Sequence, residues 1–272
     1  MSLNNILLIF LTSVYSLWIA YLFVGNKFAL DKPDNRKKHF LSIPQMGGVV
    51  FAPLFLLIAS TLGLLPYWYI IGATITIILG TLDDFISIRW QYKFVVQLFI
   101  GIFISYIFWY KIESIYFYEL SFQLSQINLL IIFMIWFIGI YNAVNLIDGL
   151  DGLAGGFALI LCFALSQSNY INFNNLNFIL GIIILGFLIF NQRPAKLFMG
   201  DAGSLFLGFH IAVSPLLYIN SSTDLSRLDM TPFVLCCFYL IADTTRVFLT
   251  RIANKKSPMT ADTIHFHHLI YN

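Results

Sequence analysis

The stretch INLLIIFMIWFIGIYNAVNLIDGLDGLAGG, residues 127–156, joins an almost unbroken apolar run to a segment with two carboxylates and two carboxamides. The solvent around such a stretch decides how it folds. Of the 272 residues, 59% are hydrophobic and 10% are charged. Soluble domains are about 45–50% apolar and about 25% charged, and one core could not hold this excess. The composition therefore predicts an integral membrane protein.

Most hydrophobic segments along the chain are about 17 to 22 residues long, enough to cross the hydrocarbon layer as helices. Two of the expected spans are shorter, as is usual where a helix end lies in a protein-lined cavity. They are continuous and do not alternate, which favours helices over a β-barrel. The first segment begins almost at the N-terminus without a cleavage pattern of small residues, so we expect a retained helix. The nine expected spans are Leu3–Val24, Met46–Leu65, Tyr67–Leu82, Phe94–Tyr110, Ile127–Val144, Leu153–Leu165, Phe178–Phe190, Ser204–Ile219 and Thr231–Leu249. The expected fold class is all-α: a polytopic integral membrane protein with about nine transmembrane helices, forming a single membrane-embedded domain over residues 1–272.

The positive charges predict the orientation, because Lys and Arg in short loops are retained on the cytoplasmic side. If the loops after spans one, three, five, seven and nine face inward, all but Lys111 and Arg227 of the 15 Lys and Arg residues lie in or beside them. This places the N-terminus outside and the C-terminus in the cytoplasm, in an inner (plasma) membrane. The cytoplasmic loops then cover residues 25–48, 82–93, 142–156, 191–204 and 243–272.

Several polar or reactive residues inside the spans have ordinary structural explanations. Cys162, Cys236 and Cys237 are best interpreted as small packing residues, with no disulfide implied. His210 is interpreted as a hydrogen-bonded structural residue rather than a ligand.

Adjacent carboxylates, Asp83 and Asp84, end the third span. Such neighbours repel each other and resist desolvation, and a divalent cation resolves both problems. Carboxylate and water oxygens suit Mg²⁺ or Mn²⁺, which binds one or two protein carboxylates together with substrate phosphates. A solvated helix end is the alternative explanation of this pair.

Four polar residues follow the apolar run at intervals of three: Asn142, Asn145, Asp148 and Asp151. At this spacing side chains lie close together on one face of a helix. A polar cap with glycines as helix breakers is the alternative, but it accounts for one or two polar residues rather than four. The segment is therefore interpreted as part of a binding site.

Two further motifs lie on the same expected side. In MGDAGS, Asp201 stands between glycines just before a span, where backbone N–H groups can hold a phosphate and a carboxylate can hold its metal; a plain Gly-Asp turn is the alternative. In HFHH, the imidazoles of His265, His267 and His268 follow a basic stretch. They could bind zinc, but neighbouring carboxylates, Lys and Arg favour hydrogen bonding to a phosphorylated substrate.

In chain order, the D-x-P-x-x-R-K-x-H to G-G loop, L-D-D, N-x-x-N-L-x-D-G-x-D-G-L, F-M-G-D-x-G-S and H-x-H-H extend from about Asp31 to the end. This set resembles the polyprenyl-phosphate N-acetylhexosamine-1-phosphate transferases, the MraY/WecA group. The resemblance implies transfer of a sugar 1-phosphate from a UDP-sugar to a polyprenyl phosphate such as undecaprenyl phosphate, at the cytoplasmic membrane face. UMP is released, and Mg²⁺ or Mn²⁺ is the cofactor.

The resemblance also implies roles for individual residues. Asp83, Asp84 and Asp201 are the expected catalytic residues, and Asp84, Asp201 and Asn145 the expected metal ligands. Asp83 is expected to act as a general base, with phosphate and metal positioning as the alternative, and a covalent aspartyl-phosphate route stays open. The expected substrate-binding residues are Lys93, Asn145, Asp148, Asp151, His265, His267, His268, Arg36 and His39.

The chain departs from the family pattern in three places. Ser87 stands where a third acidic residue often follows the Asp-Asp pair, and the sequence ends four residues after His268, as either a short natural form or a truncated one. Residues 111–126 alternate enough to suggest a small outer hairpin.

The donor is expected to be UDP-GlcNAc or a related UDP-N-acetylhexosamine, because SPMTADTIHFHH is closer to the N-acetylglucosamine branch of the family. UDP-N-acetylfucosamine, UDP-N-acetylquinovosamine and phospho-MurNAc-pentapeptide donors are the alternatives. The expected partners are this nucleotide sugar, undecaprenyl phosphate and the lipid bilayer, with no nucleic acid, and a homodimer is left open. The product would start O-antigen, teichoic acid or a similar surface polymer.

Two other classes of protein fit the sequence less well. A Mg²⁺-dependent membrane prenyltransferase needs a second aspartate-rich repeat, and none follows DDFIS. An ion-coupled transporter would place its carboxylates near the midplane between internal repeats. Here they gather at one face, and no repeat is evident.

Overall fold

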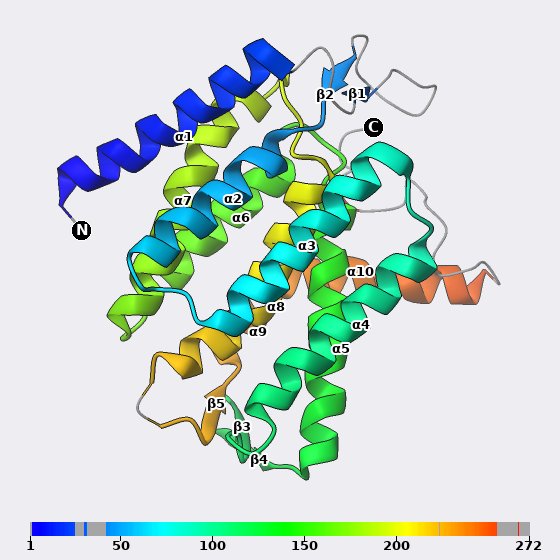
Figure 1. Cartoon of the computed structure of the whole chain (residues 1–272). Coiled ribbons are helices and arrows are strands. Elements are labelled where there is room, and N and C mark those ends of the chain that lie inside the picture. The colour runs from blue at the N-terminus through cyan, green and yellow to red at the C-terminus, as the bar shows by residue number, and fades with distance from the viewer. Residues whose placement is uncertain (1, 25–29, 32–41, 223, 255–265, 267–272) are drawn as a thin grey trace.

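The computed structural model describes residues 2–24, 30–31, 42–222, 224–254 and 266. Most of these residues form a bundle of helices, with one small sheet at each end of the bundle (Figure 1). Six of the helices are long and apolar enough to cross a membrane. The all-α, multi-pass class predicted from composition is therefore confirmed at this level.

The helices are α1 (Leu3–Val24), α2 (Gly47–Thr61), α3 (Tyr67–Ile86), α4 (Trp90–Phe108), α5 (Gln126–Ile147), α6 (Leu153–Leu165), α7 (Ile171–Asn191), α8 (Gly200–Asn220), α9 (Thr231–Cys236) and α10 (Phe238–Ala253). The strands are β1 (Leu30–Asp31), β2 (Ile43–Pro44), β3 (Ser114–Phe117), β4 (Leu120–Gln123) and β5 (Arg227–Asp229). The candidate spans are α1, α3, α4, α5, α7 and α8, while α2 and α6 are shorter apolar helices.

Helix α8 is the core of the bundle. It packs against α2, α3 and α5 and is buried along almost its whole length (Figure 1). Small residues allow this close packing, as is typical where helices meet in a membrane. A Cβ added to Gly80 of α3 would lie 2.4 Å from Cα of Ala202 on α8. The start of α8 is thus held directly against the end of α3.

A buried polar chain ties α8 to two neighbours. The hydroxyl of Tyr69 on α3 lies 2.8 Å from Nδ1 of His210, whose Nε2 lies 3.2 Å from Oδ1 of Asn177 on α7. Because Oδ1 of Asn177 can only accept, Nε2 carries the proton and Nδ1 accepts from Tyr69. The expectation that His210 is a hydrogen-bonded structural residue is confirmed. Helix α7 begins at Ile171, seven residues before the predicted span, and so includes Asn177.

The ninth expected span differs from the structure. In place of one helix over 231–249, a six-residue α9 and a sixteen-residue α10 meet at Cys237. Buried positions on α10 include Asp243 and Arg251, beside exposed Phe248 and Leu249. This amphipathic pattern is not that of a uniformly apolar span.

At the end of the bundle away from β1 and β2, the predicted hairpin is present. Strands β3 and β4 pair antiparallel over Ser114–Phe117 and Leu120–Gln123, and β5 adds to β3 in parallel. The three cysteines are free, as predicted.

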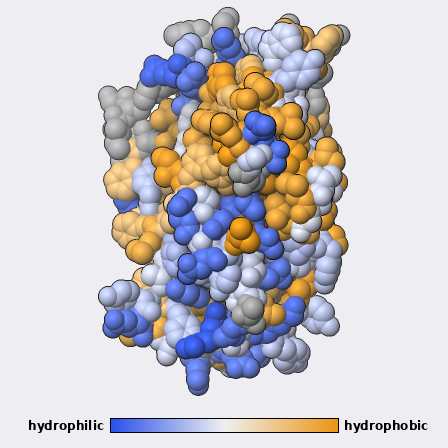
Figure 2. Space-filling view, turned by 90° about the vertical axis from the view of Figure 1, so that its left-hand side faces the viewer, coloured by the Kyte–Doolittle hydropathy of each residue, from blue (hydrophilic) through white to orange (hydrophobic). Residues whose placement is uncertain are grey.

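One side of the molecule is shown in Figure 2, where apolar residues gather in the upper part and polar residues toward the bottom. Helix α1 lies at the edge of the bundle against α7 and α2 (Figure 1). Many of its large apolar side chains are exposed, including Leu8, Tyr15 and Leu22. Such an outer surface fits contact with lipid tails rather than water.

Candidate active site

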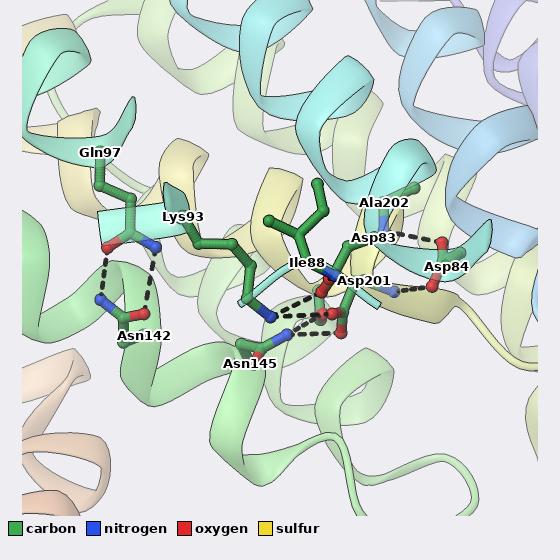
Figure 3. A network of polar contacts seen from close by, with 10 residues as sticks. Asp83, Asp84, Ile88, Lys93, Gln97, Asn142, Asn145, Asp201 and Ala202 are labelled. Atoms are coloured by element: carbon green, nitrogen blue, oxygen red, sulfur yellow. Dashed lines mark hydrogen bonds and ion pairs between the residues drawn. The ribbon is translucent and has the colours of Figure 1, made fainter. Parts of the chain in front are cut away.

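Side chains from four helices meet at one end of the bundle (Figure 3). They are Asp83 and Asp84 of α3, Lys93 of α4, Asn145 of α5 and Asp201 of α8. The sequence predicted that these residues share a site, and the structure brings all five together. Their grouping depends on the close packing of α3, α5 and α8, which no single motif reveals.

Asp84 caps the first turn of α8. Its Oδ1 accepts from the backbone N–H of Asp201 at 2.7 Å, and its Oδ2 accepts from that of Ala202 at 3.1 Å. A carboxylate is favoured there because the first N–H groups of a helix lack partners and carry partial positive charge. Gly200 has a φ of +68°, and a Cβ on it would lie 2.6 Å from Oδ2 of Asp84. The N–H groups at this helix start, which were expected to hold a phosphate, are therefore occupied by a side chain of α3.

Lys93 links two acids of the cluster. Its Nζ lies 2.6 Å from Oδ2 of Asp83 and 3.4 Å from Oδ2 of Asp201. The other oxygen of Asp83 accepts the backbone N–H of Ile88 at 2.5 Å. Both oxygens of Asp83 therefore have close donors, whereas Lys93 holds Asp201 only at the longer distance.

Asn145 orients Asp201 from the other side. Its Nδ2 donates to Oδ1 of Asp201 at 2.9 Å and lies 2.8 Å from the hydroxyl oxygen of Ser204. The second oxygen of Asp201, Oδ2, is held less tightly, because Nζ of Lys93 is 3.4 Å away. The Asp201 side chain is also 33% exposed, against 5% for Asp83. Oδ2 of Asp201 is thus the carboxylate oxygen of the cluster best placed to meet a ligand.

A hard divalent cation could use oxygen donors of this kind, with Asp201 as a direct ligand. Within the described parts of the chain, no group of three or more His, Cys, Asp or Glu side chains is arranged to hold a metal. Mg²⁺ commonly takes one or two carboxylates and completes its shell with water and substrate phosphate. Asp84 and Asn145, the other expected ligands, already contact the start of α8, so the geometry favours supporting roles for both.

The four polar residues spaced three apart do not share a helix face, and that expectation is wrong. Helix α5 ends at Ile147, and Gly152 with a φ of +76° redirects the chain. Asn142 forms a two-way amide pair with Gln97 of α4, at 2.8 and 3.1 Å (Figure 3). Oδ2 of Asp151 accepts the N–H of Ala195 at 3.1 Å, which fixes the loop before α8.

Asp148 lies just beyond the end of α5 and is partly buried. Burial raises the pKa of its carboxyl to about 8, and the negative charges of Asp201 and Asp84 act in the same direction. A protonated carboxyl can donate a hydrogen bond, which suits recognition of a polar group on a substrate.

Five predicted site residues lie outside the described residues: Arg36, His39, His265, His267 and His268. Within the HFHH motif the structure describes Phe266, which contacts Asp243 and Arg246 of α10. Sequence reasoning assigned no role to Gln97, Ser204, Asp243 or Arg246. A polar residue inside an apolar span was the available signal for Gln97 and Ser204.

Comparison with known proteins defines the class to which this site belongs. Residues 65–219 match the family model of Glycosyl transferase family 4. The chain therefore belongs to that family and is a membrane-embedded transferase, which confirms the resemblance predicted from its motifs.

Individual relatives carry two kinds of name. The chain is 36% identical to a probable undecaprenyl-phosphate N-acetylglucosaminyl 1-phosphate transferase of Bacillus subtilis, over 88% of this chain and 69% of the relative. It is 29% identical to an undecaprenyl-phosphate alpha-N-acetylglucosaminyl 1-phosphate transferase of Thermotoga maritima, over 96% of this chain and 77% of the relative. It is 34% identical to a phospho-N-acetylmuramoyl-pentapeptide-transferase of Lactococcus lactis subsp. cremoris, over 64% of this chain and 59% of the relative.

Proposed function

We propose that this chain transfers N-acetylglucosamine 1-phosphate from UDP-GlcNAc to undecaprenyl phosphate, releasing UMP, with Mg²⁺ or Mn²⁺ bound at Asp201. The observation that carries this proposal is the convergence of Asp83, Asp84, Asp201, Asn145 and Lys93 at one end of an apolar bundle. The names of the relatives support the donor and the acceptor.

Charge balance supports the need for a cation. Two carboxylates, Asp83 and Asp201, lie beside the ammonium group of Lys93, a third, Asp84, contacts the backbone of Asp201, and both proposed substrates are anionic. Bringing two phosphate groups together beside these acids requires added positive charge. A bound divalent cation supplies charge neutralisation and alignment of the reacting phosphates.

The bond chemistry needs little from a protein base. A phosphate oxygen of the lipid attacks the sugar-bearing phosphorus of UDP-GlcNAc, and the bond from that phosphorus to the bridging oxygen breaks as UMP leaves. A phosphate monoester with a second pKa of about 6 is mostly dianionic at neutral pH and is already a nucleophile. Both oxygens of Asp83 already accept hydrogen bonds, from the N–H of Ile88 and from Nζ of Lys93. We therefore propose that Asp83 positions Lys93 and does not abstract a proton.

The nucleotide sugar is proposed to contact the loop after α5 and the histidine motif. Asp148 is the residue of that loop best suited to donate a hydrogen bond, because its carboxyl has a raised pKa. The basic loop with Arg36 and His39 and the imidazoles of His265, His267 and His268 are proposed to bind phosphate groups.

The alternative donor class is the UDP-linked MurNAc-pentapeptide, since relatives with that activity in their names also match the chain. UDP-N-acetylfucosamine and UDP-N-acetylquinovosamine stay open as 6-deoxy donors. The closeness of SPMTADTIHFHH to the N-acetylglucosamine branch favours UDP-GlcNAc.

The proposed topology has about nine membrane passes, the last of them broken at Cys237, with an outer N-terminus and a cytoplasmic site in the inner membrane. The excess of Lys and Arg on the side of the site supports this orientation. The product would initiate a cell-surface polysaccharide such as O-antigen or teichoic acid.

The test is transfer of radiolabelled GlcNAc 1-phosphate from UDP-GlcNAc to undecaprenyl phosphate by purified protein, with and without Mg²⁺. We expect metal-dependent lipid labelling that falls at least about 100-fold in Asp201→Asn. Asp224→Asn, at an exposed acid before β5, is the matched control and should keep full activity. Lipid labelling only with the UDP-linked MurNAc-pentapeptide would show that this compound, and not UDP-GlcNAc, is the donor. Folded protein that gives no product with any donor would overturn the proposal.

A further inference from the structure

Two amide side chains form a pair one helical turn away from the candidate active site (Figure 3). Gln97 of α4 is 2% exposed, and its Nε2 donates to Oδ1 of Asn142 on α5 at 3.1 Å. In return, Nδ2 of Asn142 donates to Oε1 of Gln97 at 2.8 Å. A buried amide in an apolar helix is costly unless it is hydrogen-bonded, and hydrogen bonds between side chains of this kind join helices within a membrane. The pair is therefore a polar link between α4 and α5.

The direction of the pair is set by the backbone of α5. Nδ2 of Asn142 also donates to the carbonyl oxygen of Ile138 at 2.8 Å. Because a carbonyl oxygen can only accept, the nitrogen of Asn142 lies on that side and its Oδ1 is left to accept from Gln97. Helix α5 thus holds the amide of Asn142 in place, and that amide offers one donor and one acceptor to α4.

The helix faces that form the pair also carry residues of the site. On α4, Gln97 follows Lys93 by four residues, and on α5, Asn142 precedes Asn145 by three. Side chains three or four residues apart lie on the same face of a helix, about 4.5 to 6 Å apart along its axis. The distance between α4 and α5 at the pair therefore also decides where Lys93 begins.

The position of the Lys93 ammonium group depends on α4. Helix α4 packs mainly against α5 and less against α3. From α4, Nζ of Lys93 lies 2.6 Å from Oδ2 of Asp83 and 3.4 Å from Oδ2 of Asp201. The lysine stem is flexible, so the protein must fix its base to fix its charge. A misplacement of about 1 Å at a reacting group can cost about 100-fold in rate.

We propose that Gln97 and Asn142 are positioning residues, whose amide pair fixes α4 against α5 so that the ammonium group of Lys93 lies between Asp83 and Asp201. Neither amide touches the substrate. This inference rests on the proposed function for the reaction that Lys93 serves. The placement of Lys93 by the pair does not depend on that reaction.

The kinetic test breaks the pair and then rebuilds it. Gln97→Met removes the amide and keeps a side chain of similar length. Gln97→Asn combined with Asn142→Gln exchanges the two amides and keeps their summed length. We expect kcat to fall at least about tenfold in Gln97→Met and to return to within about twofold of wild type in the exchange variant. No fall in Gln97→Met would overturn the proposal.

The metal dependence separates Lys93 from Asp201 as the group on which the pair acts. Asn145 holds Oδ1 of Asp201 at 2.9 Å from α5 and does not involve α4. The Mg²⁺ concentration that gives half-maximal activity should therefore be the same in Gln97→Met as in wild type. A shift of about tenfold would show that the pair acts through Asp201 and would contradict the role assigned to it.

The chain offers a matched control at the other end of the bundle. Asn174, in the first turn of α7, accepts the backbone N–H of Ser168 at 3.0 Å and donates to its carbonyl oxygen at 2.6 Å. Asn174→Leu also removes a hydrogen-bonded amide from a helix, but far from Lys93. It should keep the kcat of wild type. Transfer is measured well below the melting temperature of every variant, so that a lower rate does not report unfolding.

A second measurement needs no substrate. Acetylation of lysines by sulfo-NHS-acetate is followed by mass spectrometry, with the exposed Lys111 as a reactive reference. The Lys93 side chain is 23% exposed and ion-paired, so it should react slowly. We expect Lys93 to react at least about threefold faster in Gln97→Met than in wild type or Asn174→Leu.

The two measurements together decide the proposal. An exchange variant that stays slow in transfer supports the positioning role if its Lys93 also reacts fast. A variant that loses transfer while Lys93 stays protected, or one that exposes Lys93 and keeps transfer, would overturn this role. If wild type transfers no sugar phosphate from any donor, but Lys93 reacts faster in Gln97→Met, the proposed function fails and the positioning role stands.

Discussion

Asp84 on α3 accepts the backbone N–H of Asp201 on α8 at 2.7 Å, so one candidate catalytic acid fixes the backbone of another. Since Ala202 donates to the second oxygen of Asp84, the carboxylate is both part of the site and the cap of the central helix. A substitution at Asp84 therefore acts on the fold and on the chemistry together.

Replacing Asp84 with Ala should lower stability as well as activity. Loss of a helix cap costs about 0.5–2 kcal/mol, so the melting temperature in detergent should fall clearly. Asp224→Ala, at an exposed acid near β5, should leave it nearly unchanged. An Asp84→Ala protein that melts like wild type and has lost all activity would contradict the capping role.

Asn145→Ala should weaken metal binding while the fold persists. Asn145 holds Oδ1 of Asp201 at 2.9 Å, and loss of such an orienting partner typically lowers metal affinity about 10- to 100-fold. The measurement is the Mg²⁺ concentration that gives half-maximal activity, together with Mn²⁺ binding by electron paramagnetic resonance. Asn142→Ala, one turn earlier on α5, breaks the Gln97 pair and should not change either value.

The membrane class and the five converging residues could be predicted from the sequence, because a long apolar run and a charged residue at its end are local signals. The role of each of these five residues could not be predicted from the sequence. Asp84 and Asp201 are 117 positions apart, and only the packing of Gly80 against Ala202 places one carboxylate at the start of the other residue's helix.

The segment at the end of α5 shows the same limit. A spacing of three predicts one helix face for Asn142, Asn145, Asp148 and Asp151 only while the helix continues. Helix α5 ends at Ile147, and the polar residues have different partners: Gln97 for Asn142, and the N–H of Ala195 for Asp151. The ninth expected span is two helices instead of one for a related reason, because average hydropathy does not register a helix break at Cys237 or a buried ion pair on α10.

Asp148 predicts a pH dependence of stability. Its pKa is raised from 3.8 to about 8, so between these values the unfolded chain loses this proton and the folded chain keeps it. The folded state then binds more protons, and stability falls as the pH rises through this window. In metal-free buffer, Asp148→Asn should exceed wild type in melting temperature by a margin that grows from about pH 6 to about pH 8.5. A constant margin would contradict the raised pKa.

Two glycine substitutions should have opposite effects. Gly80→Ala places a methyl group 2.4 Å from Cα of Ala202 and 2.6 Å from the carbonyl oxygen of Asp201, where backbone cannot move aside cheaply. Overpacking of this kind costs about 1–3 kcal/mol, and it displaces α8 from α3, so both melting temperature and activity should fall.

A Cβ added to Gly156 of α6 would meet open space among the described residues, so Gly156→Ala should stabilise the helix by about 0.5–1 kcal/mol and leave activity intact. Thermal melts and transfer rates of the two variants, measured side by side, check this; equal melting temperatures would show that α3 and α8 are not held in contact at Gly80.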